Sequence, residues 1–293
     1  MGFEDIVEDA AFSLIRLAVT DLPADVKGAL ERACRVEVSE IGRAQLGNVI
    51  KNFCLAGEGG LPLCQDTGLI EVYVWVGDRF GSVRGLEGAF VGAVRRATER
   101  VPLRPNAVEP FTRVNSGDNT GRGLPRVVWG FVEGDGLEIA VVPKGGGGEN
   151  VSRLGMLGPT EGVAGVKRFV VDAVVEAGAR PCPPVIVGVG VGGSADQALG
   201  LAKRALLRPL DEPNPEARLA GLEEELLELI NATGIGPMGL GGSTTALGVR
   251  VDWAHCHTAS LPVGVVFQCW AARRARARIH RDGRVEYLSH GRR

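Results

Sequence analysis

The sequence LPLCQDTGLIEVYVWV, residues 61–76, joins a polar loop to an apolar run. In the run, Ile70, Val72, Val74 and Val76 alternate with other residues and would share one face of a β-strand. No secondary structure explains the Cys, Gln and Asp of the preceding loop, and sites are usually built on such loops. The stretch therefore predicts a sheet with a functional loop at its edge.

The segments around this strand alternate between helical and strand patterns. Helices are predicted over residues 1–57 (three helices), 86–100, 160–178, after the capping-box pair Ser194 and Gln197, and from Asn214-Pro215 to about Ile230. Strands are predicted at 184–191, 245–253, 263–270 and 274–288, with a hairpin at 126–143 that turns at Gly134-Asp135-Gly136. These elements predict a mixed, α+β-like α/β fold, with N-terminal helices packed on largely antiparallel sheets. We expect one domain over residues 1–293, its helical segment spanning about 1–57.

Composition excludes several classes of protein. Hydrophobic residues make up 45% of the chain, which is enough for a sizeable core and excludes a disordered polymer. No apolar run approaches the roughly 20 residues of a membrane span. The acidic N-terminus, MGFEDIVEDA, is neither a secretory signal nor a transit peptide, so we expect a cytoplasmic protein. Arginines concentrate in residues 273–293, which favours a solvated face or a subunit contact over a nucleic-acid site.

The six cysteines lie far apart, at positions 34, 54, 64, 182, 256 and 269. A reducing compartment argues against a disulfide framework. Cys34 and Cys54 fall on apolar helical faces and read as small hydrophobic residues. Cys64, Cys182 and Cys269 lie at strand edges and suit an iron–sulfur cluster with one iron left open, although spacing alone favours three unrelated thiols.

Three further patterns suggest other sites. His255, Cys256 and His257 include zinc-type ligands, but strand neighbours face opposite ways, so we expect Cys256 to pack and one histidine to be functional. GVGVGG at 188–193 has the form of a dinucleotide fingerprint, although no ribose-binding acid follows at the expected distance. A nucleotide-binding module is therefore a minority interpretation.

Two glycine-rich segments and two arginines suggest anion binding. KGGGGEN at 144–150 and GLGGST at 239–244 could each present several backbone N–H groups to phosphate or to a carboxylate. Arg104 and Arg113 lie in a polar loop and are candidates for forked binding of a carboxylate.

Taken together, these motifs resemble one family. The chain between about residues 40 and 275 is similar to the alpha subunit, or N-terminal half, of class I iron–sulfur fumarate hydratases and the related L-tartrate dehydratases. Five segments carry this resemblance: LPLCQDTG, the RPN…VNSGDNTG loop, KGGGGEN, CPPVIVGVGVGG and HxASLPVxxxxQCWA. The resemblance implies a [4Fe–4S] cluster held by Cys64, Cys182 and Cys269, with one iron not bound by protein. Single-chain fumarases have a further Cys where this chain has Leu261.

The resemblance also implies the remaining parts of the site. Substrate contacts would fall on Gln65, Asp66, Arg104, the Gly146 backbone and His257, with Gln65, Asp66 and His257 orienting the reacting groups. The implied activity is a hydro-lyase that interconverts fumarate and (S)-malate, a reaction of the tricarboxylic acid cycle. L(+)-tartrate dehydratase is the alternative, because the loop at 113–121 is closer to that pattern. The catalytic base would come from a separate beta subunit, in a dimer of alpha–beta pairs.

Overall fold

The computed structural model describes residues 2–290, which form two compact units. Of the described residues, unit 1 contains 2–24, 52–146 and 273–290, and unit 2 contains 25–51 and 147–272. Each unit has its own core. The expectation of a single domain stays a prediction. No helix among the described residues is long and apolar enough to cross a membrane.

The N-terminal region forms the three helices that the sequence predicts. They are α1 (Phe3–Thr20), α2 (Ala24–Val36) and α3 (Glu40–Gly59). Cys34 on α2 is half-buried, but Cys54 on α3 is exposed. The prediction that Cys54 packs in an apolar face is therefore wrong, since the buried side of α3 at this turn is formed by Phe53 and Ala56.

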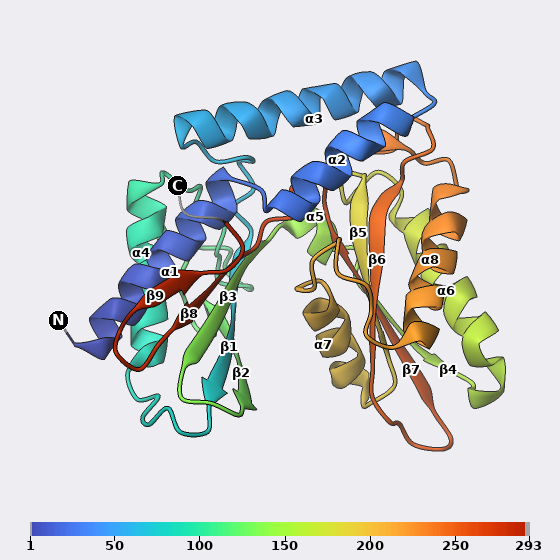
Figure 1. The fold of residues 1–293 in the computed structure, drawn as a ribbon. Helices are drawn as coiled ribbons and strands as arrows, with labels where there is room; N and C mark the ends of the chain where they lie inside the picture. The colour runs from blue at the N-terminus through green and yellow to red at the C-terminus, as the bar shows by residue number, and fades with distance from the viewer. Residues whose placement is uncertain (1, 291–293) are drawn as a thin grey trace. The chain divides into compact units, whose positions relative to one another are not determined.

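Unit 1 is built on a five-stranded sheet (Figure 1). Its order is β2 (Arg126–Val132), β1 (Leu69–Gly77), β3 (Leu137–Lys144), β8 (Ala275–Ile279) and β9 (Val285–Tyr287), and only the β1–β2 pair is parallel. The predicted apolar face of β1 is confirmed, because Ile70, Val72, Val74 and Val76 are buried in one core with α1 and α4 (Leu86–Arg100). The predominance of antiparallel pairs is also confirmed.

The predicted hairpin at 126–143 is wrong. β2 and β3 do not pair with each other, because β1 lies between them. The turn residues instead accept hydrogen bonds from the end of β1 and from the loop just after it. Gly77 N donates to Gly136 O and Arg79 N donates to Gly134 O, both at 2.9 Å. The buried β1 needs a hydrogen-bonding partner on each edge, and this requirement overrides the local turn signal.

Unit 2 is built on a four-stranded sheet. Its order is β4 (Arg153–Leu157), β7 (Leu261–Gln268), β5 (Val185–Val191) and β6 (Ala246–Trp253), with only β5 and β6 parallel. Helices α6 (Gly162–Ala177) and α8 (Ala217–Asn231) share a core with one face of this sheet, and α7 (Ala195–Ala205) packs on the other face (Figure 1). The short elements are α5 (Gly146–Glu149), η1 (Pro159–Glu161) and η2 (Pro237–Gly239).

Two helices of unit 2 begin close to their predicted positions, but the predicted capping interactions differ. Ser194 precedes α7 as predicted, but its hydroxyl donates to the Asp196 carboxylate and makes no capping bond. The capping-box prediction is therefore wrong. Asn214 does not begin α8 directly; its Oδ1 accepts from Glu216 N at 3.1 Å, and the helix starts at Ala217.

The glycines of GVGVGG serve the packing of α7. A Cβ on Gly188 would stand 2.3 Å from Ala202 O, and one on Gly190 would stand 2.0 Å from Ala198 O. These two residues face α7, while Val187 and Val189 face the core shared with α6 and α8. Close helix–strand packing thus explains the first two glycines without a nucleotide.

Replacing Gly190 with alanine is expected to destabilise the chain by about 3 kcal/mol, because the added methyl would push α7 away from β5. Gly200→Ala on α7 is the matched control, since a Cβ there meets nothing within 4 Å. The control should leave stability unchanged or raise it by up to about 1 kcal/mol. Urea unfolding measures both, and equal midpoints for the two variants would refute this packing role.

The two units repeat one topology. In unit 1, β1 is followed by α4, by the parallel strand β2, and by β3, which pairs antiparallel on the other edge of β1. In unit 2, β5, α7, β6 and β7 follow the same plan, with α8 inserted. The segment before the first strand and the segment after the last therefore meet at one end of each sheet. Both meeting points carry predicted site residues.

The arginine-rich C-terminal segment is largely ordered structure and not a tail. Arg273 and Arg274 are buried, and Arg276 and Arg278 on β8 pair with the Glu138 carboxylate. The last two arginines, Arg292 and Arg293, lie outside the described residues.

Candidate functional site

In unit 1, the pairing of β1 with β3 brings CQDTG and KGGGG together. Leu69, at the start of β1, lies opposite Lys144, at the end of β3. Gly68 has a φ of 76°, and a Cβ there would stand 2.4 Å from the Lys144 carbonyl. The CQDTG loop can approach the end of β3 this closely only because residue 68 is glycine.

Asp66 connects three of the predicted segments. Its Oδ1 accepts from Gly68 N and from Asn106 Nδ2, both at 3.0 Å, and its Oδ2 accepts from Gly146 N at 2.8 Å. The structure therefore brings Asp66 and Gly146, two of the candidate site residues, into direct contact. It also shows that the Gly146 N–H, expected to bind substrate, is bound to the Asp66 carboxylate.

Gln65 and Arg104 are exposed residues of unit 1. The backbone of Arg104 is fixed by Asn119, whose Nδ2 donates to Arg104 O at 3.2 Å and whose Oδ1 accepts from Asn106 N at 2.6 Å. Asn119 is buried and has a φ of 59°, which asparagine tolerates better than most residues. Sequence reasoning missed Asn106 and Asn119 as individual residues, although the density of Asn in this loop was the signal.

In unit 2, the pairing of β5 with β7 brings Cys182 and Cys269 together. Ile186, near the start of β5, lies opposite Gln268, at the end of β7. Cys182 precedes β5 and Cys269 follows β7, and Trp270 N donates to Cys182 O at 3.2 Å. Cys182 is exposed, with a φ of 54°, and Cys269 is half-buried.

The donor chemistry of these positions fits an iron–sulfur cluster. Thiolates are its usual protein ligands, and the two cysteines of unit 2, one exposed and one half-buried, flank the same end of the β5–β7 pair. The third predicted ligand, Cys64, is a half-buried residue of unit 1, two positions before Asp66. None of the six cysteines, all of which lie in the described chain, forms a disulfide. Within either unit, the described residues include no group of three or more His, Cys, Asp and Glu side chains that could hold a metal ion.

His257 lies at the other end of the unit 2 sheet. It belongs to the loop between β6 and β7, and β5 approaches this loop at its far end, where Val191 pairs with Val263. A strand rises about 3.3 Å per residue, so the ladder from Ile186 to Val191 spans roughly 16 Å between the sheet end with the two cysteines and the end next to the His257 loop. The unit therefore does not bring His257 to Cys182 and Cys269.

The loop around His257 has a local turn structure. His257 is exposed, and its Nδ1 accepts from Ala259 N at 3.1 Å. Cys256 is also exposed, and its Sγ donates to Ser260 O at 3.2 Å. The expectation that Cys256 packs in the interior is wrong, because the residue lies in a surface loop beyond the end of β6.

The predicted anion nest at GLGGST holds a carboxylate of the chain itself. Glu37, which follows α2 and is 1% exposed, accepts from Ser243 N at 2.8 Å and from Thr244 N at 2.8 Å. It also accepts from Ser39 N at 2.9 Å. Burial raises the pKa of this carboxyl, but the hydrogen bonds from Ser39, Ser243 and Thr244 outweigh burial and lower the pKa from 4.5 to about 2.

Glu37→Gln is expected to lower the free energy of unfolding by about 3 kcal/mol at neutral pH, because the buried N–H groups lose the charged acceptor. Since the folded pKa is depressed, this contribution is complete above pH 4.5 and is lost as the pH falls toward about 2. Wild type and variant should therefore converge in acid. Urea unfolding at neutral pH and in acid measures the difference in unfolding free energy between wild type and Glu37→Gln. Substitution of the exposed Glu40 by Gln is the control. A constant difference across the range would contradict the assignment.

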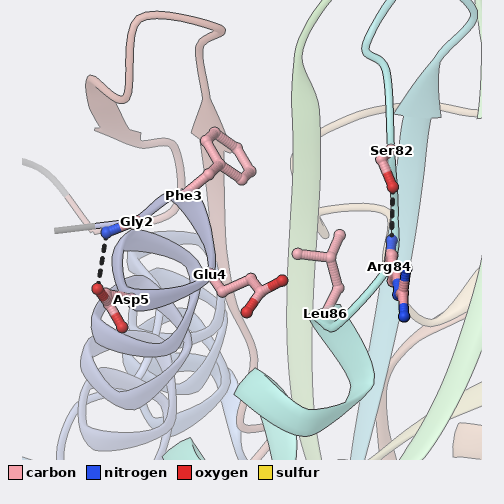
Figure 2. Close-up of a pocket in the computed structure, with 7 residues that line it drawn as sticks. All are labelled: Gly2, Phe3, Glu4, Asp5, Ser82, Arg84 and Leu86. Atoms are coloured by element: carbon pink, nitrogen blue, oxygen red, sulfur yellow. Dashed lines mark hydrogen bonds between the residues drawn. The ribbon is translucent and has the colours of Figure 1, made fainter.

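A hollow of about 550 Å³ opens elsewhere in unit 1, at the first turn of α1 (Figure 2). The segment 82–86 forms its other wall, and the carboxylate of Glu4 points toward it. It contains none of the predicted site residues.

Comparison with known proteins identifies the family to which this chain is similar. Residues 8–278 match the family model described as "Fumarate hydratase (Fumerase)". A Methanocaldococcus jannaschii protein, provisionally named L(+)-tartrate dehydratase subunit alpha, is 47% identical over 95% of this chain and 99% of its own length. The L(+)-tartrate dehydratase subunit alpha of Escherichia coli strain UTI89 is 40% identical over 93% of this chain and 90% of its own, and that of strain K12 is 39% identical over the same shares.

Proposed function

Because this chain belongs to the fumarate hydratase family of hydro-lyases, we propose that it is the alpha subunit of an L(+)-tartrate dehydratase. The observation that carries the proposal is the set of relatives with this name, which are 39–47% identical over nearly the whole chain. The reaction removes a hydroxyl group from one carbon of tartrate and a proton from the next. The resulting enol tautomerises to oxaloacetate.

Fumarate hydratase is the second candidate, and the description of the matching family model supports it. Both reactions eliminate water from a 2-hydroxy dicarboxylate, so one site could serve either. The substrates differ by a single hydroxyl group on the neighbouring carbon. A site that binds this group by hydrogen bonds would discriminate strongly against the substrate that lacks it.

The proposal assigns Cys64, Cys182 and Cys269 as ligands of a [4Fe–4S] cluster with one iron not bound by protein. When bound, this group supplies a Lewis acid for departure of the hydroxyl group. The thiol chemistry of the three positions and the adjacency of Cys182 to Cys269 support the assignment. The cluster type and the open iron rest on the resemblance to the family.

The chain's own residues would bind and orient the substrate. Asp66 fixes the CQDTG, RPN and KGGGG segments to one another and thereby positions its neighbour Gln65 and the loop of Arg104. The Arg104 guanidinium is exposed and can form two parallel hydrogen bonds with a carboxylate. Gln65, Asp66 and His257 stay our proposed catalytic contacts, with Arg104 and Gly146 completing the substrate site; the Gly146 N–H, which donates to Asp66, would be shared between that carboxylate and the substrate.

The position of His257 constrains the assembly. The unit 2 sheet separates this residue from Cys182 and Cys269 of the same chain. We therefore propose that His257 reaches the substrate bound at the cysteines of a second copy. This requirement supports the expected dimer of alpha–beta pairs, in which the beta subunit supplies the catalytic base. The location of the enzyme in the cytoplasm also remains a proposal.

The test is a comparison of substrates on the anaerobically reconstituted complex with its beta subunit. We expect kcat/KM for L(+)-tartrate to exceed that for (S)-malate by on the order of 100-fold or more. A preference for malate would replace the first candidate with the second. An iron-loaded complex that dehydrates neither compound would refute both.

A further inference from the structure

Arg273 is a buried arginine whose guanidinium has no hydrogen-bond or ion-pair partner among residues 2–290. It lies in unit 1, two residues before β8, and is 2% exposed. Its Nε is inaccessible and has no acceptor, and its guanidinium makes no hydrogen bond or ion pair within residues 2–290. By contrast, Arg276 and Arg278 in the next strand both pair with Glu138.

An unpaired guanidinium is costly in this position. Arginine cannot lose its proton in a protein, so burial leaves a full charge with little access to water. Such a charge costs several kcal/mol unless an anion or a set of acceptors compensates it. The planar fork of arginine matches the geometry of a carboxylate.

The guanidinium points to the loop that Asp66 organises. Its Nη2 lies 3.5 Å from the place where a Cβ on Gly145 would stand, and Asp66 Oδ2 lies 2.9 Å from the same place. Arg273 is nevertheless not within ion-pair distance of Asp66, which already accepts hydrogen bonds from Gly68, Asn106 and Gly146. The absence of a side chain at Gly145 leaves the guanidinium facing this loop.

We propose that Arg273 binds a carboxylate of the substrate beside Gly145. The proposal rests on the proposed function for the dicarboxylate nature of the ligand, but the anion-binding role follows from the buried charge. It assigns Arg273 and Arg104 different parts: Arg104 is exposed and reaches substrate from a loop, whereas Arg273 provides a rigid, desolvated contact.

The experiment compares wild type, Arg273→Met and Arg273→Lys in the alpha–beta complex, with Arg278→Met as the matched control. Succinate, a dicarboxylate that cannot be dehydrated, is titrated by calorimetry, and thermal unfolding is followed with and without it. We expect Arg273→Met to weaken succinate binding by about 100-fold or more and Arg273→Lys by about tenfold. The control should bind as wild type does.

Thermal unfolding separates binding from a structural role. Removal of an uncompensated buried charge should raise the midpoint of ligand-free Arg273→Met and abolish its rise with succinate. A lowered midpoint together with unchanged succinate affinity in Arg273→Lys would overturn the proposal. The proposal would also be overturned if the Arg273 variants kept the wild-type affinity for succinate but bound the beta subunit more weakly. That result would assign Arg273 to the subunit interface.

This outcome is independent of the proposed reaction. If wild type dehydrates tartrate but Arg273→Met keeps its succinate affinity, only the role of Arg273 fails. If wild type dehydrates neither substrate but binds succinate, and Arg273→Met does not bind it, the anion site stands and the proposed function fails.

Discussion

Serine at any one of positions 64, 182 and 269 is expected to lower dehydratase activity by more than about 100-fold and to lower the iron and sulfide content of the reconstituted protein in parallel. The physical reason is that a serine hydroxyl keeps its proton at neutral pH, whereas a cysteine thiol readily becomes the thiolate that iron binds. Activity and iron content should be measured on the same anaerobic preparations.

The chain offers matched controls for this series. Cys54 and Cys256 are both exposed, on α3 and in the β6–β7 loop, and neither is a proposed ligand. Cys54→Ser and Cys256→Ser should retain wild-type iron and activity. Full iron loading in all three of the first variants would show that these cysteines do not hold a cluster.

Activity is expected to return when two inactive alpha variants are combined, if His257 acts on the neighbouring copy. His257→Asn leaves the cysteines intact, and Cys269→Ser leaves His257 intact. In a hybrid dimer, one of the two sites then has both. With random assembly half of the dimers are hybrids, so co-expression should restore about a quarter of wild-type activity.

Differently tagged subunits allow the hybrid to be purified and measured directly. Each variant expressed alone is the control and should be nearly inactive. If purified hybrids are as inactive as the single variants, His257 does not act across a dimer. In that case the residue either acts within its own chain or has no contact with the substrate.

The strands were predictable because their sequence pattern is local. The alternation of Ile70, Val72, Val74 and Val76 predicts which face of β1 is buried, and the structure confirms it. The pairing of the strands was not predictable in the same way. Whether β3 pairs with β2 or with β1 depends on the hydrogen-bonding needs of a strand more than fifty residues away, which the turn at 134–136 does not reveal.

For the glycine-rich segments, too, the sequence pattern predicts a type of interaction but not the residues that make it. GLGGST was predicted as an anion nest, and its N–H groups do bind a carboxylate, but the carboxylate is that of Glu37, about two hundred residues earlier. Likewise the Gly146 N–H binds Asp66. The motif identified the type of binding partner, and only the fold identified which residue supplies it. In the sequence, Arg273 is one arginine among several in a basic segment, and its burial cannot be predicted from composition.

The most direct measurement is an anaerobic crystal structure of the reconstituted alpha–beta complex, with iron located by its anomalous scattering. We expect one four-iron cluster bound by the sulfurs of Cys64, Cys182 and Cys269, with the fourth iron carrying no protein ligand. A structure in which Cys64 lies away from the other two sulfurs, or in which iron is bound at other residues, would contradict the proposed centre.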